Sequence, residues 1–254
     1  KLDNPVHIKE IKIEIPKIEK YAKNLARIIV SKHKNILPKF KKKFKANIHV
    51  YYDFGNCKFK GKVRQIGDNR DHIQFGNNGN PYGSLNVVLN NGNILNATKF
   101  RLFIPKTRSN LNEILGVLLL KQNDFITPET FHVNVNVNGN RNLMIFQENA
   151  EKELLERNKR VEGPLFEGDE SILWSYKNYK NGELSNFALA RQTNINFFLK
   201  GKNYRKISLH AFGELQRSYL NYTSTLSNKN LNIIPNDKSN EKFTQFFLNM
   251  IALN

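Results

Sequence analysis

The chain has 254 residues, of which 39% are hydrophobic, and it carries a formal net charge of +18. Such a length holds one large domain or two small ones, and such a charge predicts contact with an anion, whether nucleic acid, anionic lipid, a nucleotide or an acidic polymer. The single cysteine excludes an intrachain disulfide and a cysteine-based zinc site, no H-E-x-x-H pattern is present, and no stretch is apolar enough to span a bilayer.

The first part of the chain, residues 1–45, is predicted to form a strand, a helix and a basic linker. Residues 8–14 read as a short strand, and Pro16 begins a helix that continues to about Ser31 because apolar residues recur there at helical spacing. Lysines then crowd the stretch from Lys39 to Lys45. A solvated linker is the simpler explanation of that run, and an anion site is the alternative.

The middle of the chain is rich in predicted hairpins. Alternating apolar residues and asparagine-glycine or similar turns indicate antiparallel pairs of strands. The predicted pairs are 46–53 with 57–66, 84–89 with 99–104, and 130–137 with 143–146. Predicted helices cover 109–122, 149–158, 187–199, 207–222 and 241–253. This order predicts an α+β fold, with an antiparallel, hairpin-rich lobe over 46–174 and a mainly helical segment over 175–254.

A first candidate motif follows the strand 57–66. It consists of Arg64, Gly67, Asp68, Arg70, Asp71 and His72. The two arginines would make forked contacts to phosphate oxygens, while the aspartates would orient them or help to hold a cation. An internal network of arginine and aspartate that braces the hairpin is an equally good interpretation.

A second candidate motif lies on the strand 99–104 and just after it. Lys99 and Arg101 share one face of that strand, and a buried cation there needs an anion, such as a nucleotide phosphate. Glu113 or Glu148 would serve equally as an ion-pair partner. Arg108 lies at the start of the helix 109–122, where anions bind readily, although ordinary surface charge is the alternative.

A third motif spans residues 146–174. Its charged residues are Glu148, Lys152, Glu153, Glu156, Arg160, Glu162 and then Asp169 and Glu170. A solvated helix explains the alternating charges over 149–158, but it does not explain the ordered residues after them, which include Gly163-Pro164.

In this order and spacing, the three motifs resemble the CotH-kinase-like family, which is named after a spore-coat protein. The family's Arg-x-x-Gly-Asp-x-x-Asp-His block is met by residues 64–72, its Pro-x-Thr-Arg block by residues 105–108 with Glu113 just beyond, and its last block by Glu148 to Pro164. The resemblance covers about residues 46–174.

The resemblance implies an atypical protein-kinase-like fold whose complete members transfer a phosphoryl group from ATP, with Mg²⁺, to a protein or surface-polymer acceptor. Arg64, Lys99, Arg101 and Arg108 would bind the phosphates, and Glu148 would orient one of these cations. Many relatives are bacterial envelope proteins, so an envelope protein or an anionic polymer is the expected partner, in the envelope or the cytoplasm.

Two departures from the family pattern limit this expectation. Asn86 and Val88 stand where the family has basic residues, and no equivalent of its catalytic aspartates occurs before Asn254. We therefore expect a C-terminally truncated member that is inactive on its own. The alternative is a non-catalytic module that binds an anionic polymer or a partner protein through a basic face. Nucleic-acid binding rests on charge alone, so no specific nucleic acid is expected as a partner.

These hypotheses differ in what they require of the cations. Phosphate binding requires Arg64, Lys99 and Arg101 to converge on one cleft. Structural bracing requires each of them to pair with a carboxylate away from solvent. Nucleic-acid binding requires a continuous stripe of lysine and arginine.

Overall fold

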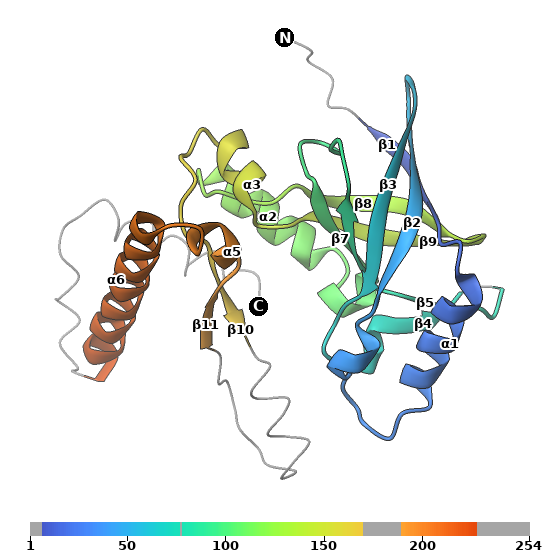
Figure 1. Ribbon diagram of the computed structural model, residues 1–254, viewed down its shortest axis with the longest axis horizontal. Coiled ribbons are helices and arrows are strands. Elements are labelled where there is room, and N and C mark those ends of the chain that lie inside the picture. Colours follow the sequence, from blue (N-terminus) through green and yellow to red (C-terminus); the bar gives the residue numbers. More distant parts are fainter. Residues whose placement is uncertain (1–6, 77, 170–188, 228–254) are drawn as a thin grey trace.

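Figure 1 shows a computed structural model of the chain, which describes residues 7–76, 78–169 and 189–227. The strands are β1 (Ile8–Glu14), β2 (Lys43–Tyr52), β3 (Gly55–Gln65), β4 (Ile73–Phe75), β5 (Pro81–Gly83), β6 (Leu85–Leu89), β7 (Lys99–Phe103), β8 (Thr130–Val137), β9 (Asn140–Glu148), β10 (Phe166–Asp169) and β11 (Leu189–Gln192). The α-helices are α1 (Ile18–Ile29), α2 (Asn112–Gln122), α3 (Lys152–Arg157), α5 (Ile195–Phe198) and α6 (Lys202–Ser227). Short 3-10 helices are η1 (Pro38–Phe40), η2 (Arg70–His72) and η3 (Pro105–Arg108).

A closed barrel dominates the fold, with its strands in the order β1-β2-β3-β6-β7-β9-β8. Its neighbouring strands are antiparallel except for β1 and β8, which run parallel and close the barrel. Ile11 of β1 lies opposite Val50 of β2 on one side and Val135 of β8 on the other. The predicted α+β, kinase-like plan is therefore wrong, because the hairpins join into one barrel with few helices instead of a sheet lobe followed by a mainly helical lobe.

The local elements agree better with the sequence. The three predicted hairpins are confirmed as β2 with β3, β6 with β7, and β8 with β9. The helix predicted over 187–199 is wrong, because the described residues there form β11, which pairs with β10, and the short helix α5. The helix predicted over 241–253 lies outside the described residues.

Apolar side chains fill the inside of the barrel. Strand residues alternate between the two faces, so every second residue points inward. Phe100 of β7, Phe146 of β9 and Phe131 of β8 stack in a row, with ring centroids 4.7 Å apart for the first pair and 4.8 Å for the second. Phe100 and Phe146 have no exposed surface. Since this interior is packed, a binding site has to lie on the outside or at an end of the barrel.

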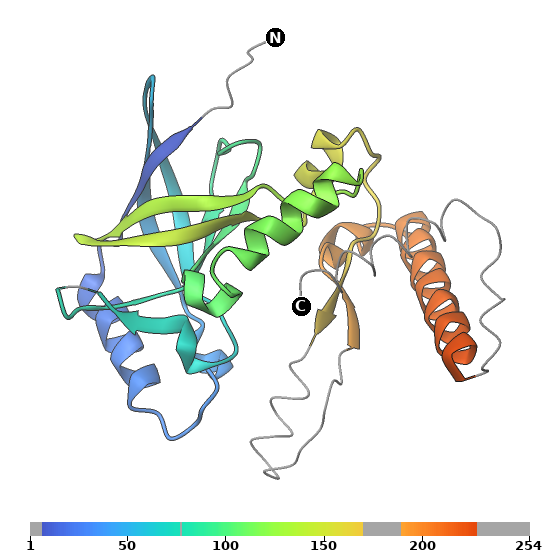
Figure 2. The same cartoon turned by 180° about the vertical axis from the view of Figure 1, so that it is seen from behind.

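Helix α1 packs at one end of the barrel, beside β4 and β5 (Figure 1). Its apolar face carries Tyr21, Leu25 and Ile28, which all join the barrel core. The Asn24 side-chain amide donates a hydrogen bond of 2.8 Å to the carbonyl of Phe40, which ties α1 to η1. Figure 2 shows that α2, α3 and the later elements lie on the side of the barrel away from α1.

Candidate functional site

Cations line the outer surface of the barrel on β2, β3 and β7, with β6 between β3 and β7. Strand β3 alternates between buried and outward-facing residues, and the outward series from residue 58 to 64 is entirely basic. Strand β2 adds two lysines at its start, and β7 adds two more cations. We call this surface the basic face, and it consists of Lys43, Lys45, Lys58, Lys60, Lys62, Arg64, Lys99 and Arg101.

The strand register brings like charges together on the basic face. Lys45 lies directly opposite Lys62, and Lys43 lies opposite Arg64. Like charges in such positions destabilise a sheet. No acidic residue occurs on β2, β3, β6 or β7 to relieve the repulsion. The face therefore concentrates positive charge at a cost that a bound anion would offset.

Two rows cross from β3 to β7. In one row Arg64 lies opposite Asn86 of β6, which lies opposite Arg101. In the other, Val88 of β6 separates Lys62 from Lys99. The fold thus brings Arg64, Lys99 and Arg101 to one surface. Between them lie Asn86 and Val88, the two uncharged residues that stand where the CotH-kinase-like family has basic ones.

Carboxylates reach only part of this surface. Lys99 pairs with Glu151 at 3.0 Å, and Arg101 lies 3.6 Å from Glu167. Among the described residues Arg64 has no carboxylate partner, and its buried Nε makes no hydrogen bond. The five lysines of β2 and β3 in the basic face, which are all exposed, also form no ion pair within the described ranges. Bracing therefore describes Lys99 and Arg101. The rest of the face makes no ion pair within the described ranges, and its one electrostatic contact with a carboxylate there is that of Lys58 with Glu14 of β1.

Arg108 lies at the edge of the basic face nearest α2. Its guanidinium stacks on the Phe103 ring, 4.1 Å from the centroid. Burial lowers the pKa of Arg108, the carboxylate of Glu113 opposes that change, and the charge of Arg101 adds to it. Glu113 itself accepts a hydrogen bond of 2.6 Å from Gln147. Arg108 therefore lies near both Glu113 and Arg101, and it is partly covered.

The block from Gly67 to His72 braces the barrel end. Asp68 pairs with Lys41 at 2.8 Å, and the guanidinium of Arg70 donates to the carbonyls of Ile29 and Ser31 at the end of α1. These contacts are internal, as the bracing interpretation expects, but neither of them joins an arginine to an aspartate.

The other members of that block have local roles. The His72 ring lies 3.0 Å from the Ser84 hydroxyl, and burial is the main cause that lowers its pKa. Gly67 has a φ of 99°, and a Cβ there would lie 2.1 Å from the His72 ring. Asp71 is exposed next to His72. The positive φ and the close approach of the His72 ring explain why the turn needs a glycine at position 67.

The third motif meets the basic face only through Glu151 and Glu167, which pair with Lys99 and Arg101, and its predicted site residues have other partners. Glu148 pairs with Arg157 at 2.5 Å and not with Lys99 or Arg101. Lys152 makes an exposed ion pair with Glu156 at 3.7 Å. Arg160 and Glu162 lie between α3 and β10 and form no ion pair with another described residue. Sequence reasoning missed Arg157, whose partners come from β9 and from the segment before β8.

The lysines of β3 were also missed, although the sequence carried a signal for them. Lys58, Lys60, Lys62 and Arg64 occupy every second position of a predicted strand, which places them on one face.

No family model matches the chain, and no curated protein matches it. The resemblance to the CotH-kinase-like family therefore rests on the motif residues alone. Within residues 7–76, 78–169 and 189–227, no group of His, Cys, Asp and Glu side chains is arranged to hold a metal ion.

No helix in the described part of the chain has the length and apolar character to cross a membrane.

Proposed function

We propose that this chain is a binding module that holds an anionic polymer on the basic face. The observation that carries the proposal is the direct cross-strand apposition of Lys45 with Lys62 and of Lys43 with Arg64, without a carboxylate on these strands. A polymer with regularly repeated negative charges would relieve the repulsion at several positions at once, and released counterions would add to the affinity.

The geometry favours an extended polymer over a compact anion. Successive outward residues of β3 lie roughly 7 Å apart, so the series from Lys58 to Arg64 spans about 20 Å. The rows to β7 widen the surface to four strands. A chain of phosphate or carboxylate groups laid along β3 would meet a cation at each step.

The test measures binding of a long inorganic polyphosphate to the protein by fluorescence anisotropy at two salt concentrations. We expect affinity to fall as salt rises, because the contacts are exposed charges. Combining Lys58→Gln, Lys60→Gln and Lys62→Gln should weaken binding about 10- to 100-fold, which corresponds to roughly 0.5–1 kcal/mol for each lost contact.

A matched control removes the same charge elsewhere. Lys17, Lys20 and Lys23 are exposed residues at α1, outside the basic face. The corresponding triple Lys→Gln variant should bind within about threefold of the wild type. If both triple variants lose affinity equally, only net charge matters and the proposed face is wrong.

A second proposal retains nucleotide binding. The Nε atoms of Arg64 and Arg108 are both buried without a hydrogen-bond partner in the described residues, and a phosphate placed near them would satisfy such donors. On this proposal the chain contributes phosphate contacts to a CotH-like phosphotransferase that acts, with ATP and Mg²⁺, on an envelope protein or a surface polymer.

Calorimetry with Mg-ATP separates the two proposals. Nucleotide binding predicts that Arg64→Ala lowers the affinity about tenfold or more, as the loss of a charge-assisted contact would. The triple lysine variant on β3 should keep most of that affinity. An unchanged affinity in Arg64→Ala would remove the nucleotide proposal and leave the polymer proposal standing.

A further inference from the structure

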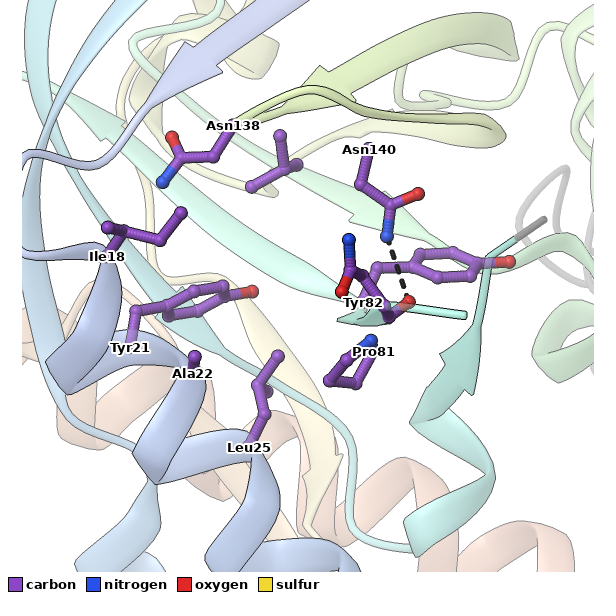
Figure 3. A pocket seen from close by; sticks show the side chains of 10 residues that line it. Ile18, Tyr21, Ala22, Leu25, Pro81, Tyr82, Asn138 and Asn140 are labelled. Carbon is purple, nitrogen blue, oxygen red and sulfur yellow. Dashed lines mark hydrogen bonds between the residues drawn. The ribbon is translucent and has the colours of Figure 1, made fainter. Parts of the chain in front are cut away.

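A pocket of about 150 Å³ lies where α1 meets β5 and the turn between β8 and β9 (Figure 3). Its walls are mainly apolar. Ile18 and Leu25 contribute from α1, Pro81 from β5 and Val137 from the end of β8. None of the described residues that line the pocket is charged. The pocket is separate from the basic face, so an occupant would be chemically different from an anionic polymer.

A buried polar group of this pocket lacks a partner among the residues that the structure describes. The hydroxyl of Tyr21 is buried and makes no hydrogen bond with any described residue. Figure 3 shows that it points from α1 into the pocket. The tyrosine residue is only 5% exposed, and its ring is held edge-on against Phe44 at 5.5 Å between the centroids. Burial raises the pKa of Tyr21, so the hydroxyl keeps its proton and is a hydrogen-bond donor. A buried donor without an acceptor costs roughly 1–3 kcal/mol.

The neighbouring carboxamides are already engaged. Asn138 accepts from the Ile15 amide at 2.7 Å and donates to the Ile15 carbonyl at 3.2 Å. Asn140 donates to the carbonyl of Asn80 at 3.0 Å and accepts from Asn142 at the same distance. The side chains of Asn138 and Asn140 therefore form a fixed polar rim, and the Tyr21 hydroxyl is a buried donor available to an occupant.

We propose that this pocket binds a small, neutral, mainly apolar molecule that has one hydrogen-bond acceptor, such as a carbonyl oxygen, which accepts from the Tyr21 hydroxyl. An apolar cavity of roughly 150 Å³ accommodates a benzene-sized ring, so the ligand class is a single ring with a short polar substituent. The absence of charge among the described lining residues favours a neutral ligand, because an ion would lose its hydration without a counter-charge.

The test compares two probes of nearly equal shape. Acetophenone carries a carbonyl oxygen, and α-methylstyrene has a methylene group in its place. Ligand-observed NMR titration should show that the wild-type protein binds acetophenone about fivefold more tightly, the amount expected for one net hydrogen bond. In Tyr21→Phe that preference should disappear while α-methylstyrene still binds, because the ring and the cavity remain.

A pair of rim variants locates the site. Ala22 is an exposed residue of α1 at the pocket, and Ala26 is exposed one turn further along and does not line it. Ala22→Phe should lower the affinity for both probes at least fivefold, because the new ring occupies part of the pocket. Ala26→Phe should leave both affinities unchanged. The proposal is wrong if the wild-type protein binds neither probe, if Tyr21→Phe keeps the preference for acetophenone, or if the two rim variants behave alike.

Discussion

Phe100→Ala is expected to destabilise the protein by about 3–5 kcal/mol, the cost of removing a large aromatic side chain from a packed core. Phe100 is fully buried in the barrel and stacks on Phe146 at 4.7 Å between the ring centroids. The neighbouring strands are fixed by their hydrogen bonds, so they would collapse only partly into the space left behind. Unfolding in urea, followed by far-ultraviolet circular dichroism, measures the change in free energy of unfolding.

Phe75 on β4 provides the matched control, because the same residue type is 63% exposed there. Phe75→Ala should cost about 0.5 kcal/mol or less, as is usual for surface substitutions. Equal losses in the two variants would contradict the packed barrel, since an unfilled or mobile interior would not distinguish an inner phenylalanine from an outer one.

Arg157→Met is expected to cost about 3–5 kcal/mol at neutral pH, since it leaves a buried carboxylate without its cation. The Glu148 side chain is only 1% exposed and lies 2.5 Å from the Arg157 guanidinium. The same guanidinium binds Glu129 at 2.9 Å and the Thr127 carbonyl at 3.0 Å. One cation therefore joins α3 to β9 and to the segment that leads into β8.

The pH dependence of this loss has a definite sign. Burial is the main cause that raises the pKa of Glu148, and hydrogen bonds from the Glu129 amide and from Arg157 oppose the rise. Without Arg157 the folded-state pKa would rise further above the unfolded value. The folded protein would then hold an extra proton between the two values, so its stability falls as pH rises through that window. We expect the difference from the wild type to be larger at about pH 7 than at about pH 5.

Two further variants test the cause of this loss. Adding Glu148→Gln to Arg157→Met should restore part of the stability at neutral pH and remove the pH dependence, because a neutral amide replaces the buried charge. Arg141→Met breaks an exposed pair with Glu10, 2.8 Å long, and should cost about 1 kcal/mol or less. If Arg157→Met costs no more than Arg141→Met, the buried network does not contribute as described.

The hairpins were predictable because their signals are local. A turn such as Asn138-Gly139 between two alternating segments specifies the pairing of β8 with β9. The barrel was not predictable in this way. Its closing pair, β1 with β8, joins strands from distant parts of the chain. The sequence of residues 8–14 does not indicate which strand it pairs with. The α+β expectation followed from treating that strand as separate from the hairpins.

The candidate site likewise has a part that local sequence patterns predict and a part that depends on contacts between distant segments. Alternation on one strand would have placed Lys58, Lys60 and Lys62 on one face from the sequence alone. The apposition of Lys45 with Lys62 needed the register between β2 and β3. The pairing of Arg157 with Glu148 depends on how α3 lies against β9, and the partner of Arg101 comes from β10. Such tertiary contacts leave no fixed spacing in the sequence.

The parallel pairing of β1 with β8 also sets an order of events during biosynthesis. A ribosome releases Ile8–Glu14 long before Thr130–Val137, so the nascent barrel has to wait with one side of β1 open. Such open edges invite pairing with other chains, and pairings between distant segments form slowly. Lys9 and Lys12 on β1 carry the kind of charge that discourages a foreign strand until β8 arrives.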